Sequence, residues 1–327
     1  MTMQKSEGKR KEKAMKDYRM FLAALVVLFA PTLAQPQTTD VKKGPEILPH
    51  VSITVLVDNM AGGGPILGEW GASFVVQANK DQILIDAGQG QVLLGNARAL
   101  EADLSKTKAI VISHEHLDHT QGLDSAFRAC GPVDFYVHPA GFETRYWKDG
   151  SHAEPHSLPY TREELTKRVR RLIETKEPTK VAEGIIVTGQ IPRTTDFEDT
   201  GLRGVAFLDA NLSVPDPVVD DQAVFFRVPE GVVIVLGCGH AGLVNTMNYV
   251  SKLTGERRIY AVIGGTHLIS ASSDRLKRTI EALRQYDVQK VMLSHCTGAR
   301  AFSELACALP GRCTWPASGS VIEFGGK

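Results

Sequence analysis

From residue 51 onward, short apolar runs rich in β-branched residues alternate with stretches that have helical spacing. A period of two residues indicates a strand, and a period near 3.6 indicates a helix. Strands are predicted at residues 51–58, 72–77, 82–86, 109–113, 133–137, 223–228, 232–236, 259–263, 290–293 and 321–324. Strands that alternate with helices predict a layered α/β protein.

Helices are predicted between these strands. Residues 91–102 have helical spacing, and Thr161 with Glu164 forms a capping box that opens a helix running toward Lys176. Two later helices follow from apolar residues on one face: Leu243, Met247 and Val250 before a stop at Gly255, and Leu276, Ile280 and Leu283. Residues 148–159 and 188–217, rich in Gly, Pro, Ser, Asp and Thr, are predicted to be loops.

The N-terminus has the three parts of a secretory signal peptide. Basic residues between Lys9 and Arg19 precede an apolar run over 20–30, and Thr32-Leu33-Ala34 supplies small residues for cleavage. The apolar run is shorter than the roughly 20 residues that span a bilayer. We therefore predict a signal peptide over 1–34, with an uncleaved anchor as the alternative, then a linker over 35–50 and one domain over 51–327. The protein is expected to be exported, periplasmic or secreted, with no membrane span after signal removal.

Charge and cysteine content narrow the function. Removing residues 1–34 takes away seven basic and three acidic residues, so the formal net charge moves from 0 to −4. A nucleic-acid enzyme needs a concentrated basic face, so we expect a small-molecule substrate and no nucleic-acid partner. Five cysteines, an odd number, do not indicate a disulfide framework. The sequence leaves the oligomeric state open.

Three imidazoles and a carboxylate crowd the segment that follows the apolar run 109–112. Here the order is Ser113-His114-Glu115-His116-Leu117-Asp118-His119, an HxHxDH pattern. Residues two apart in an extended backbone face the same way, so His114 and His116 can hold one ion while Asp118 and His119 meet a second. The spacing predicts two metal ions about 3.5–4 Å apart.

Three further histidines each follow a predicted strand and lie beside glycines. They are His240 in Gly237-Cys238-Gly239-His240, His267 in Gly264-Gly265-Thr266-His267 and His295 in Ser294-His295-Cys296-Thr297-Gly298. Because strand ends meet at one edge of a sheet, we expect these histidines to converge on the HxHxDH segment. His138 is expected to be structural, and His50, His152 and His156 are expected to be exposed.

These residues resemble the metallo-β-lactamase superfamily over about residues 51 to 325. The resemblance implies a four-layer αββα sandwich, in which two sheets pack face to face and metals lie along one edge. It also implies that His240 joins His114 and His116 on one metal, and that His295 joins Asp118 and His119 on the other. Asp86 in Leu84-Ile85-Asp86-Ala87-Gly88 resembles the aspartate that hydrogen-bonds a metal-ligating histidine in that superfamily.

A narrower resemblance points to the branch named after an archaeal dihydropterin–ribofuranosylaminobenzene phosphate synthase. It is carried by Val57-Asp58-Asn59, Gly71-Ala72-Ser73-Phe74, Gly189-Gln190-Ile191-Pro192-Arg193 and the three histidine segments. Most hydrolases of the superfamily place a bridging aspartate where this chain has Gly264-Gly265-Thr266-His267. His267 is then a ligand or a substrate-contacting base, and Asp220 or Asp221 is a candidate for the missing carboxylate. Cys238 and Cys296 are candidate thiolate ligands or small buried residues.

The site predicts a metal-dependent hydrolase in which bound water, with its pKa lowered toward about 7, attacks an ester, a lactone or a phosphoester. Asp118 is the catalytic residue that orients the nucleophile or passes its proton on. Arg193 is the candidate contact for an anionic substrate, with a structural ion pair as the alternative. The cofactors are two divalent ions, zinc first and manganese or iron as alternatives. Rival functions are a transferase like the branch's synthase and a catalytically silent metal- or ligand-binding protein.

Overall fold

Two seven-stranded sheets form the centre of the computed structural model, which describes residues 44–326. The first sheet consists, in spatial order, of β17 (Val321–Phe324), β1 (Val51–Val57), β2 (Ser73–Ala78), β3 (Asp81–Ile85), β4 (Thr107–Val111), β5 (Asp134–Val137) and β8 (Arg171–Glu174). The second consists of β16 (Cys313–Thr314), β15 (Lys290–Leu293), β14 (Ile259–Gly264), β13 (Gly231–Leu236), β12 (Ala223–Val228), β10 (Ile185–Val187) and β9 (Thr179–Ala182). The signal peptide predicted over 1–34 lies outside the described residues.

Both sheets change from antiparallel to parallel pairing along their width. In the first sheet β1, β2 and β3 pair antiparallel, and β3, β4, β5 and β8 pair parallel. In the second, β12 and β13 pair antiparallel, and β13, β14, β15 and β16 pair parallel. The parallel strands of each half therefore send their carboxyl ends to one edge, where connecting loops can supply functional side chains.

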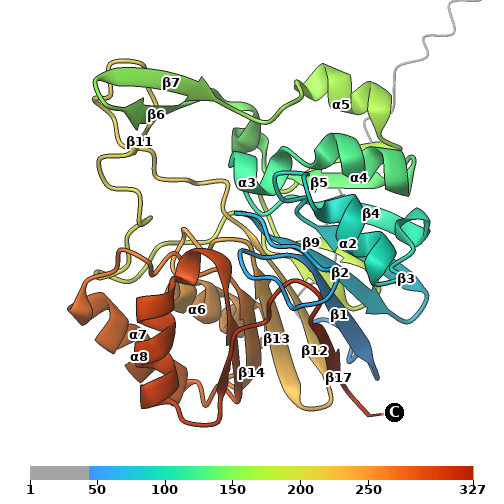
Figure 1. Ribbon diagram of the computed structural model, residues 1–327. Coiled ribbons are helices and arrows are strands. Elements are labelled where there is room, and N and C mark those ends of the chain that lie inside the picture. Colours follow the sequence, from blue (N-terminus) through green and yellow to red (C-terminus); the bar gives the residue numbers. More distant parts are fainter. Residues whose placement is uncertain (1–43, 327) are drawn as a thin grey trace, which may run out of the picture. The chain divides into compact units, whose positions relative to one another are not determined.

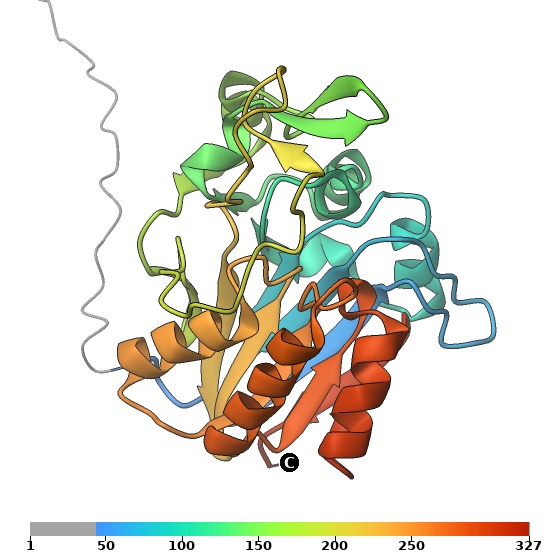
Figure 2. The ribbon, with the colours of Figure 1, turned by 90° about the vertical axis from the view of Figure 1, so that its left-hand side faces the viewer.

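Helices cover the outer face of each sheet, as Figures 1 and 2 show. The first sheet packs against α2 (Leu93–Ala99), α4 (Leu123–Cys130) and α5 (Arg162–Arg168). The second packs against α6 (Leu243–Thr254), α7 (Ser273–Gln285) and α8 (Ala299–Ala308). The predicted α/β fold, a four-layer αββα sandwich, is confirmed.

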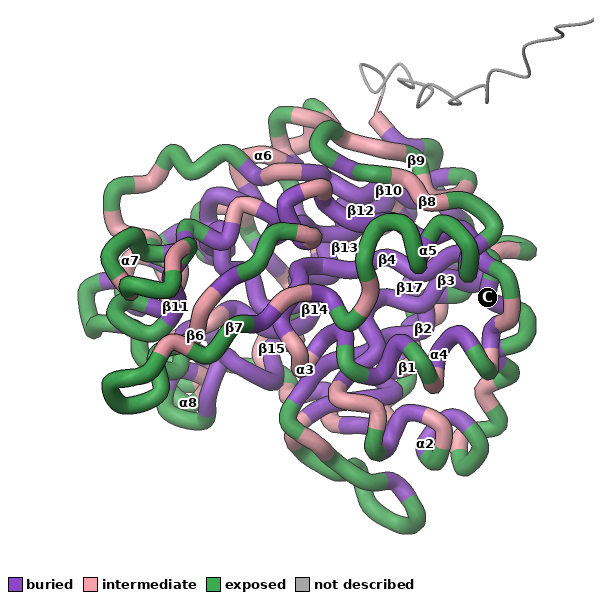
Figure 3. Tube along the Cα trace, turned by 90° about the horizontal axis from the view of Figure 1, so that it is seen from above, coloured by how far each residue is buried: buried purple, intermediate pink, exposed green. Residues whose placement is uncertain are grey.

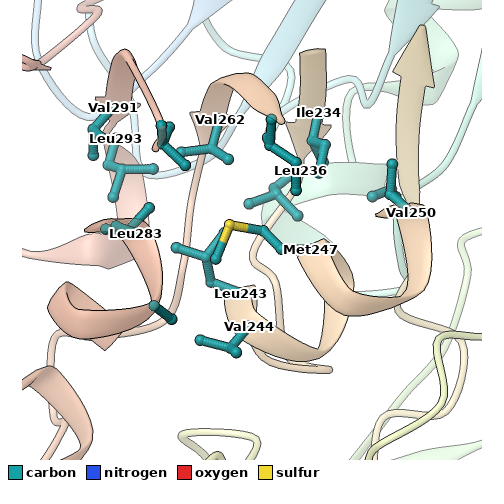
Figure 4. Packing of buried hydrophobic residues seen from close by; sticks show 14 of the residues in the cluster. Ile234, Leu236, Leu243, Val244, Met247, Val250, Val262, Leu283, Val291 and Leu293 are labelled. Atoms are coloured by element: carbon teal, nitrogen blue, oxygen red, sulfur yellow. The ribbon is translucent and has the colours of Figure 1, made fainter. Parts of the chain in front are cut away.

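The alternation of side chains explains why the strands read as continuous apolar runs. Val233 and Val235 face the first sheet, whereas Ile234 and Leu236 of the same strand face the helices. Met247 of α6 lies among this helix-facing group, as the close view in Figure 4 shows. Because both faces of β13 are buried, an apolar residue is favoured at every position of this strand. Figure 3 shows the buried strands enclosed by more exposed helices and loops.

A third, small sheet corrects part of the loop prediction. It joins β11 (Ala206–Phe207), β6 (Arg145–Asp149) and β7 (His152–His156), so residues 148–159 contain half of a hairpin. Trp147 of β6 packs against a small apolar cluster of Leu202, Ala206 and Val218. In Figure 1 this sheet lies above the strand ends, on the same side as α3 (Leu117–Thr120).

The helix predicted from Thr161 toward Lys176 is shorter than expected. The capping box at Thr161 forms, but α5 ends at Arg168 and the chain enters β8. Val169 is buried in the apolar cluster between the first sheet and its helices, and β8 pairs with β5. Tertiary packing therefore overrides the helical pattern after residue 168. Within residues 44–326, no helix combines the length and the apolar character that a membrane crossing needs.

Candidate metal centre

The HxHxDH segment begins just after β4 and changes conformation within itself. His114 and His116 lie in non-helical chain, where His116 has φ −56° and ψ 145° and forms the N-cap of α3. Asp118 and His119 fall inside α3, in its single turn. The four side chains are therefore presented by an extended piece followed by a helical turn, and not by a strand alone.

The histidines after the second sheet's strands reach the same place. His240 follows β13, and His295 opens the 3₁₀ helix η4 (His295–Thr297) after β15. The ring centroids of His114 and His240 are 4.8 Å apart, and those of His119 and His295 are 5.2 Å apart. Residues separated by more than 100 positions along the chain thus meet at the shared edge of the two sheets.

Besides a group formed by Glu115, His116 and His156, the donor atoms form two neighbouring groups that share Cys238. One contains Asp118, His119, Cys238 and His295, and the other contains His114, Cys238 and His240; the ligand atoms in each group lie within 4.8 Å of one another. The His116 ring lies beside the second group, with its centroid 4.4 Å from that of His114 and 4.8 Å from that of His240. Imidazole, carboxylate and thiolate are the ligands that Zn²⁺ accepts, so the residues fit a pair of such ions.

The hydrogen bonds of the rings orient them for metal binding. The Nδ1 atoms of four of these rings each have a hydrogen-bond partner. In the HxHxDH segment, His114 Nδ1 lies 2.9 Å from Ser113 Oγ, and His119 Nδ1 lies 2.7 Å from Asp86 Oδ2. In the other half, His240 Nδ1 lies 2.7 Å from the Thr200 carbonyl, and His295 Nδ1 lies 2.9 Å from Asn59 Oδ1. The Nε2 atoms of His114 and His240 are buried without a hydrogen-bond partner, and the buried Nε2 of His295 lies 3.2 Å from Asp118 Oδ2. A histidine whose Nδ1–H is held in this way presents the lone pair of Nε2, which is how proteins prepare imidazole ligands. This shared orientation is the strongest sign of a metal site.

Asp86 connects the two halves of the HxHxDH segment. Its carboxylate accepts hydrogen bonds from the Ser113 backbone N–H at 2.7 Å and from the Ser113 hydroxyl at 2.7 Å, and it also holds His119. The side chain is fully buried. Gly237 lies against this pair, and a Cβ at that position would collide with Ser113 Oγ and Asp86 Oδ2. Glycine is therefore required where the β13 turn crosses the aspartate.

Burial keeps most of these imidazoles neutral. Burial, with the neighbouring rings, lowers the pKa of His114 and His240 well below the usual value, and burial lowers the pKa of His116 to about 3. His119 differs: burial opposes its protonation, but the carboxylates of Asp118 and Asp86 raise its pKa to about 9. Neutral imidazole is the form that binds a cation, so His119 must release a proton when an ion binds.

A buried ionic network that was not predicted lies next to His116. Glu115, Arg145, Asp216 and Asp220 are each at most 3% exposed, and they come from three segments of the chain. Arg145 Nε lies 3.0 Å from Asp216 Oδ2 and 4.0 Å from Glu115 Oε1, and its Nη2 lies 3.6 Å from Asp220 Oδ1. No spacing along the chain links these residues, so only the fold could reveal them.

His156 corrects a prediction, because it is buried and belongs to this network. Its Nε2 lies 3.4 Å from Glu115 Oε1, and the Nε2 of His116 lies 3.7 Å from the same oxygen. The ring of Trp147 packs against both histidines, with centroid distances of 5.1 Å and 5.2 Å. The β6–β7 hairpin places His156 in the interior, whereas the prediction of a loop over residues 148–159 led us to expect an exposed side chain.

The remaining candidates lie close to the centre but outside the two donor groups. His267 stacks on His240 with ring centroids 4.4 Å apart, and its backbone N–H donates to Cys296 Sγ at 3.3 Å. Arg193 donates to the backbone carbonyls of His240, at 2.6 Å, and of Pro217 and Val218. These bonds support a structural role for Arg193, and its contact with a substrate anion stays a prediction.

Neither candidate for the missing carboxylate joins the donors. Asp220 Oδ2 accepts the Glu115 backbone N–H at 2.9 Å, and Asp221 Oδ2 accepts the Ala241 backbone N–H at 2.8 Å. Burial raises the pKa of Asp221 to about 7. Both aspartates therefore fix the loops that carry His116 and His240, and neither reaches between the two donor groups.

Solvent reaches the centre from the side of Asp118. This side chain is 17% exposed, whereas those of His119 and His295 are fully buried. Trp70 lies at this opening, 48% exposed, with its ring centroid 5.1 Å from that of His295. A small molecule would therefore meet Asp118 first, beside an aromatic face.

Comparisons with known proteins agree with this geometry. A family model described as the metallo-beta-lactamase superfamily matches residues 71–249. The chain is 30% identical over 262 residues to the 7,8-dihydropterin-6-methyl-4-(beta-D-ribofuranosyl)-aminobenzene-5'-phosphate synthase of Methanocaldococcus jannaschii, covering 77% of this chain and 89% of that one.

Solved structures show the same fold. The crystal structure of a metal-dependent hydrolase of the beta-lactamase superfamily is 25% identical with a TM-score of 0.72, covering 84% of this chain and all of the other. A metallo-beta-lactamase fold protein from Bacillus subtilis is 14% identical with a TM-score of 0.53, covering 84% of this chain and 99% of the other.

Proposed function

Because the chain belongs to the metallo-beta-lactamase superfamily, we propose that it is a metal-dependent hydrolase of an ester, lactone or phosphoester in a small molecule. One observation carries the proposal: imidazoles from both halves of the fold hold their Nδ1 atoms in hydrogen bonds and turn Nε2 toward one buried centre. Purely structural histidines have no reason to share this orientation.

The centre would hold two divalent cations, with zinc first and manganese or iron as alternatives. His114, His116 and His240 would hold one, and Asp118, His119 and His295 the other. Cations bound there would lower the pKa of a water molecule and polarise the carbonyl or phosphoryl oxygen of the substrate.

The chain's own residues would then bind and orient the reactants. The carboxylate of Asp118, within 3.2 Å of His295 Nε2 and open to solvent, can accept a hydrogen bond from the attacking water and direct its lone pair at the substrate. Trp70 can cover an apolar part of the substrate and exclude bulk water. Asp86, through His119 and Ser113, keeps the ligand set in place during turnover.

A transferase is the second candidate, because the archaeal relative is named as a synthase. In that case an organic acceptor would take the place of water. Product analysis in ¹⁸O-labelled water separates the two reactions. One labelled oxygen at the broken bond supports hydrolysis, whereas products without label support transfer.

The experiment that tests the proposal starts with metal analysis of protein purified without added metal salts. The protein is then assayed on a panel of esters, lactones and phosphodiesters. His116→Ala and Asp118→Ala should abolish turnover without unfolding the domain, because both residues act on the reacting centre. His152→Ala, an exposed histidine of β7, is the matched control and should keep full activity. Full activity in Asp118→Ala would refute the proposal, and bound metal without turnover on any substrate would favour a silent binding protein.

The location of the protein is a separate proposal. The basic stretch and apolar run of residues 1–34 support export to the periplasm or beyond the cell. N-terminal sequencing of protein from the host's periplasmic fraction should begin near residue 35. Recovery of the intact chain from the cytoplasm alone would refute export.

A further inference from the structure

One sulfur atom lies where the two donor groups meet. Cys238 belongs to both groups, so its Sγ is within 4.8 Å of the ligand atoms of His114 and His240 and also of those of Asp118, His119 and His295. Its Sγ lies 3.1 Å from His119 Nε2, and the residue is only 2% exposed. In the searched residues 44–326, Cys238 alone occurs in both of these groups.

The other residues that could supply a ligand between the two donor groups make different contacts. Thr266, which stands in the segment after β14, shares a hydrogen bond of 2.9 Å with the Thr297 hydroxyl. His267 lies in the same segment but outside both groups, and Asp220 and Asp221 hold backbone amides. The described part of the chain therefore offers no carboxylate that lies between the two groups, whereas it offers a buried thiol.

From these contacts we infer that Cys238 binds both cations as a shared thiolate. This inference rests on the proposed function, because it requires the centre to hold two metal ions. A zinc ion with bonds of about 2.3 Å to sulfur and 2.0–2.1 Å to nitrogen places these two ligand atoms about 3.6 Å apart. Cys238 Sγ and His119 Nε2 are 3.1 Å apart and hydrogen-bonded, so they would separate by about 0.5 Å when an ion binds between them. On binding, the S–H bond breaks, two metal–sulfur bonds form and one proton passes to solvent, with no change of oxidation state.

The local backbone holds the thiol in place. The turn after β13 is fixed by a hydrogen bond of 3.0 Å from the Gly265 N–H to the Gly237 carbonyl. Cys296 supports the same turn: its thiol donates to the Cys238 carbonyl at 3.6 Å and accepts the His267 N–H. Cys296 lies in neither donor group, and a serine hydroxyl can donate and accept in its place, so Cys296→Ser is a matched control for Cys238→Ser.

A shared thiolate has a consequence for metal choice. Sulfur is a soft ligand that strengthens the preference of a site for zinc and cobalt over manganese or magnesium, whereas a bridging carboxylate leaves that preference smaller. Zinc should therefore displace manganese from this protein at equal free concentrations. A carboxylate at position 238 should reduce that preference.

The test compares wild type, Cys238→Ser and Cys296→Ser after loading with Co²⁺. Wild type and Cys296→Ser should bind two cobalt ions per chain and show the near-ultraviolet band of sulfur-to-cobalt charge transfer. Cys238→Ser should lose this band and bind the ions at least about tenfold more weakly. The same band in Cys238→Ser, or two bound cobalt ions without a band in wild type, would overturn the shared thiolate and leave the proposed function intact.

A second measurement needs no variant at position 238, in case that substitution impairs folding. X-ray absorption at the zinc edge of loaded wild type and Cys296→Ser should show a sulfur neighbour at about 2.3 Å in both proteins. Nitrogen and oxygen neighbours alone would overturn the inference. Failure of wild type to bind any cation would instead refute the proposed function, and the shared thiolate with it.

Discussion

Arg145 offers the most quantitative test of the buried network beside the centre. Its side chain is 1% exposed and lies within 4.0 Å of the carboxylates of Asp216, Asp220 and Glu115. At an effective dielectric constant of about 20, each such pair attracts by about 4–6 kcal/mol, which offsets the cost of burying the charges. Arg145→Met would keep much of the volume but leave the carboxylates without their cation.

Removal of one partner from a buried ionic network costs about 3–5 kcal/mol. For a domain of this size, 1 kcal/mol corresponds to about 2 °C in melting temperature, so Arg145→Met should melt about 6–10 °C lower than wild type. Differential scanning calorimetry measures this change. The exposed Arg128, which donates a hydrogen bond to Ser125 Oγ at the surface, is the matched control, and Arg128→Met should stay within about 1 °C of wild type.

The loss should also depend on pH. Burial raises the pKa of Asp216 and Asp220, and the Arg145 guanidinium opposes this rise. Without Arg145 their folded pKa values rise further, so the folded state keeps protons that the unfolded chain releases above about pH 4. A folded state that binds more protons loses stability as pH rises. The deficit of Arg145→Met should therefore be smallest near pH 4–5 and grow toward pH 8.

Two results would refute this reasoning. A melting temperature of Arg145→Met equal to that of Arg128→Met would show that the network does not depend on its cation. A deficit that stays constant from pH 5 to pH 8 would show that the carboxylates are not responsible. Asp216→Asn added to Arg145→Met should recover part of the loss, because it removes one of the uncompensated charges.

Other outcomes follow from single contacts. Asp86→Asn keeps the shape of the side chain but removes its charge, and competition with a chromophoric chelator should show a 10- to 100-fold loss of metal affinity; unchanged affinity would argue against its role in orienting His119. Gly237→Ala should destabilise the domain by about 1–3 kcal/mol through overlap with Ser113, whereas Gly95→Ala in α2, where an added Cβ meets nothing within 4 Å, should stabilise it by about 0.5–1 kcal/mol. Both are measured by urea denaturation. Chelation should lower the melting temperature, and zinc at about 1,000 times its Kd should restore about 4 kcal/mol; a melting curve insensitive to both would contradict a metal centre.

The fold could be predicted because each main strand can be recognised from its own stretch of sequence. Runs such as residues 232–236 are apolar at every position, and the structure buries both faces of this strand. The hairpin of β6 and β7 could not be predicted, since its strands are short and mostly polar and β7 contains Pro155. Its formation depends on Arg145 and His156 at one end, which find partners only in the folded protein.

The candidate site divides in the same way. Four of the predicted ligands lie close together in sequence: His114, His116, Asp118 and His119. His240 and His295 each follow a recognisable strand. The order of residues along the chain was therefore enough to predict all six as ligands. The shared position of Cys238 depends on how two turns from different strands meet. No local sequence pattern distinguishes a ligand thiol from a small buried residue, so the sequence analysis left both interpretations of Cys238 open.

Backbone strain is the last feature that only the structure reveals, and it explains how strand ends become a rigid site. Asp86, His267 and His295 have positive φ angles of 57°, 45° and 51°, in a region that costs a non-glycine residue about 1–3 kcal/mol. Each lies where the chain leaves β3, β14 or β15. The strain at His295 is held by its backbone N–H, which donates to Asp58 Oδ1 at 3.0 Å, while Trp315 Nε1–H donates to the other oxygen of the same carboxylate at 2.9 Å. Asp58 therefore fixes His295 from the first sheet, so a change at Asp58 should disturb the metal centre without touching a ligand.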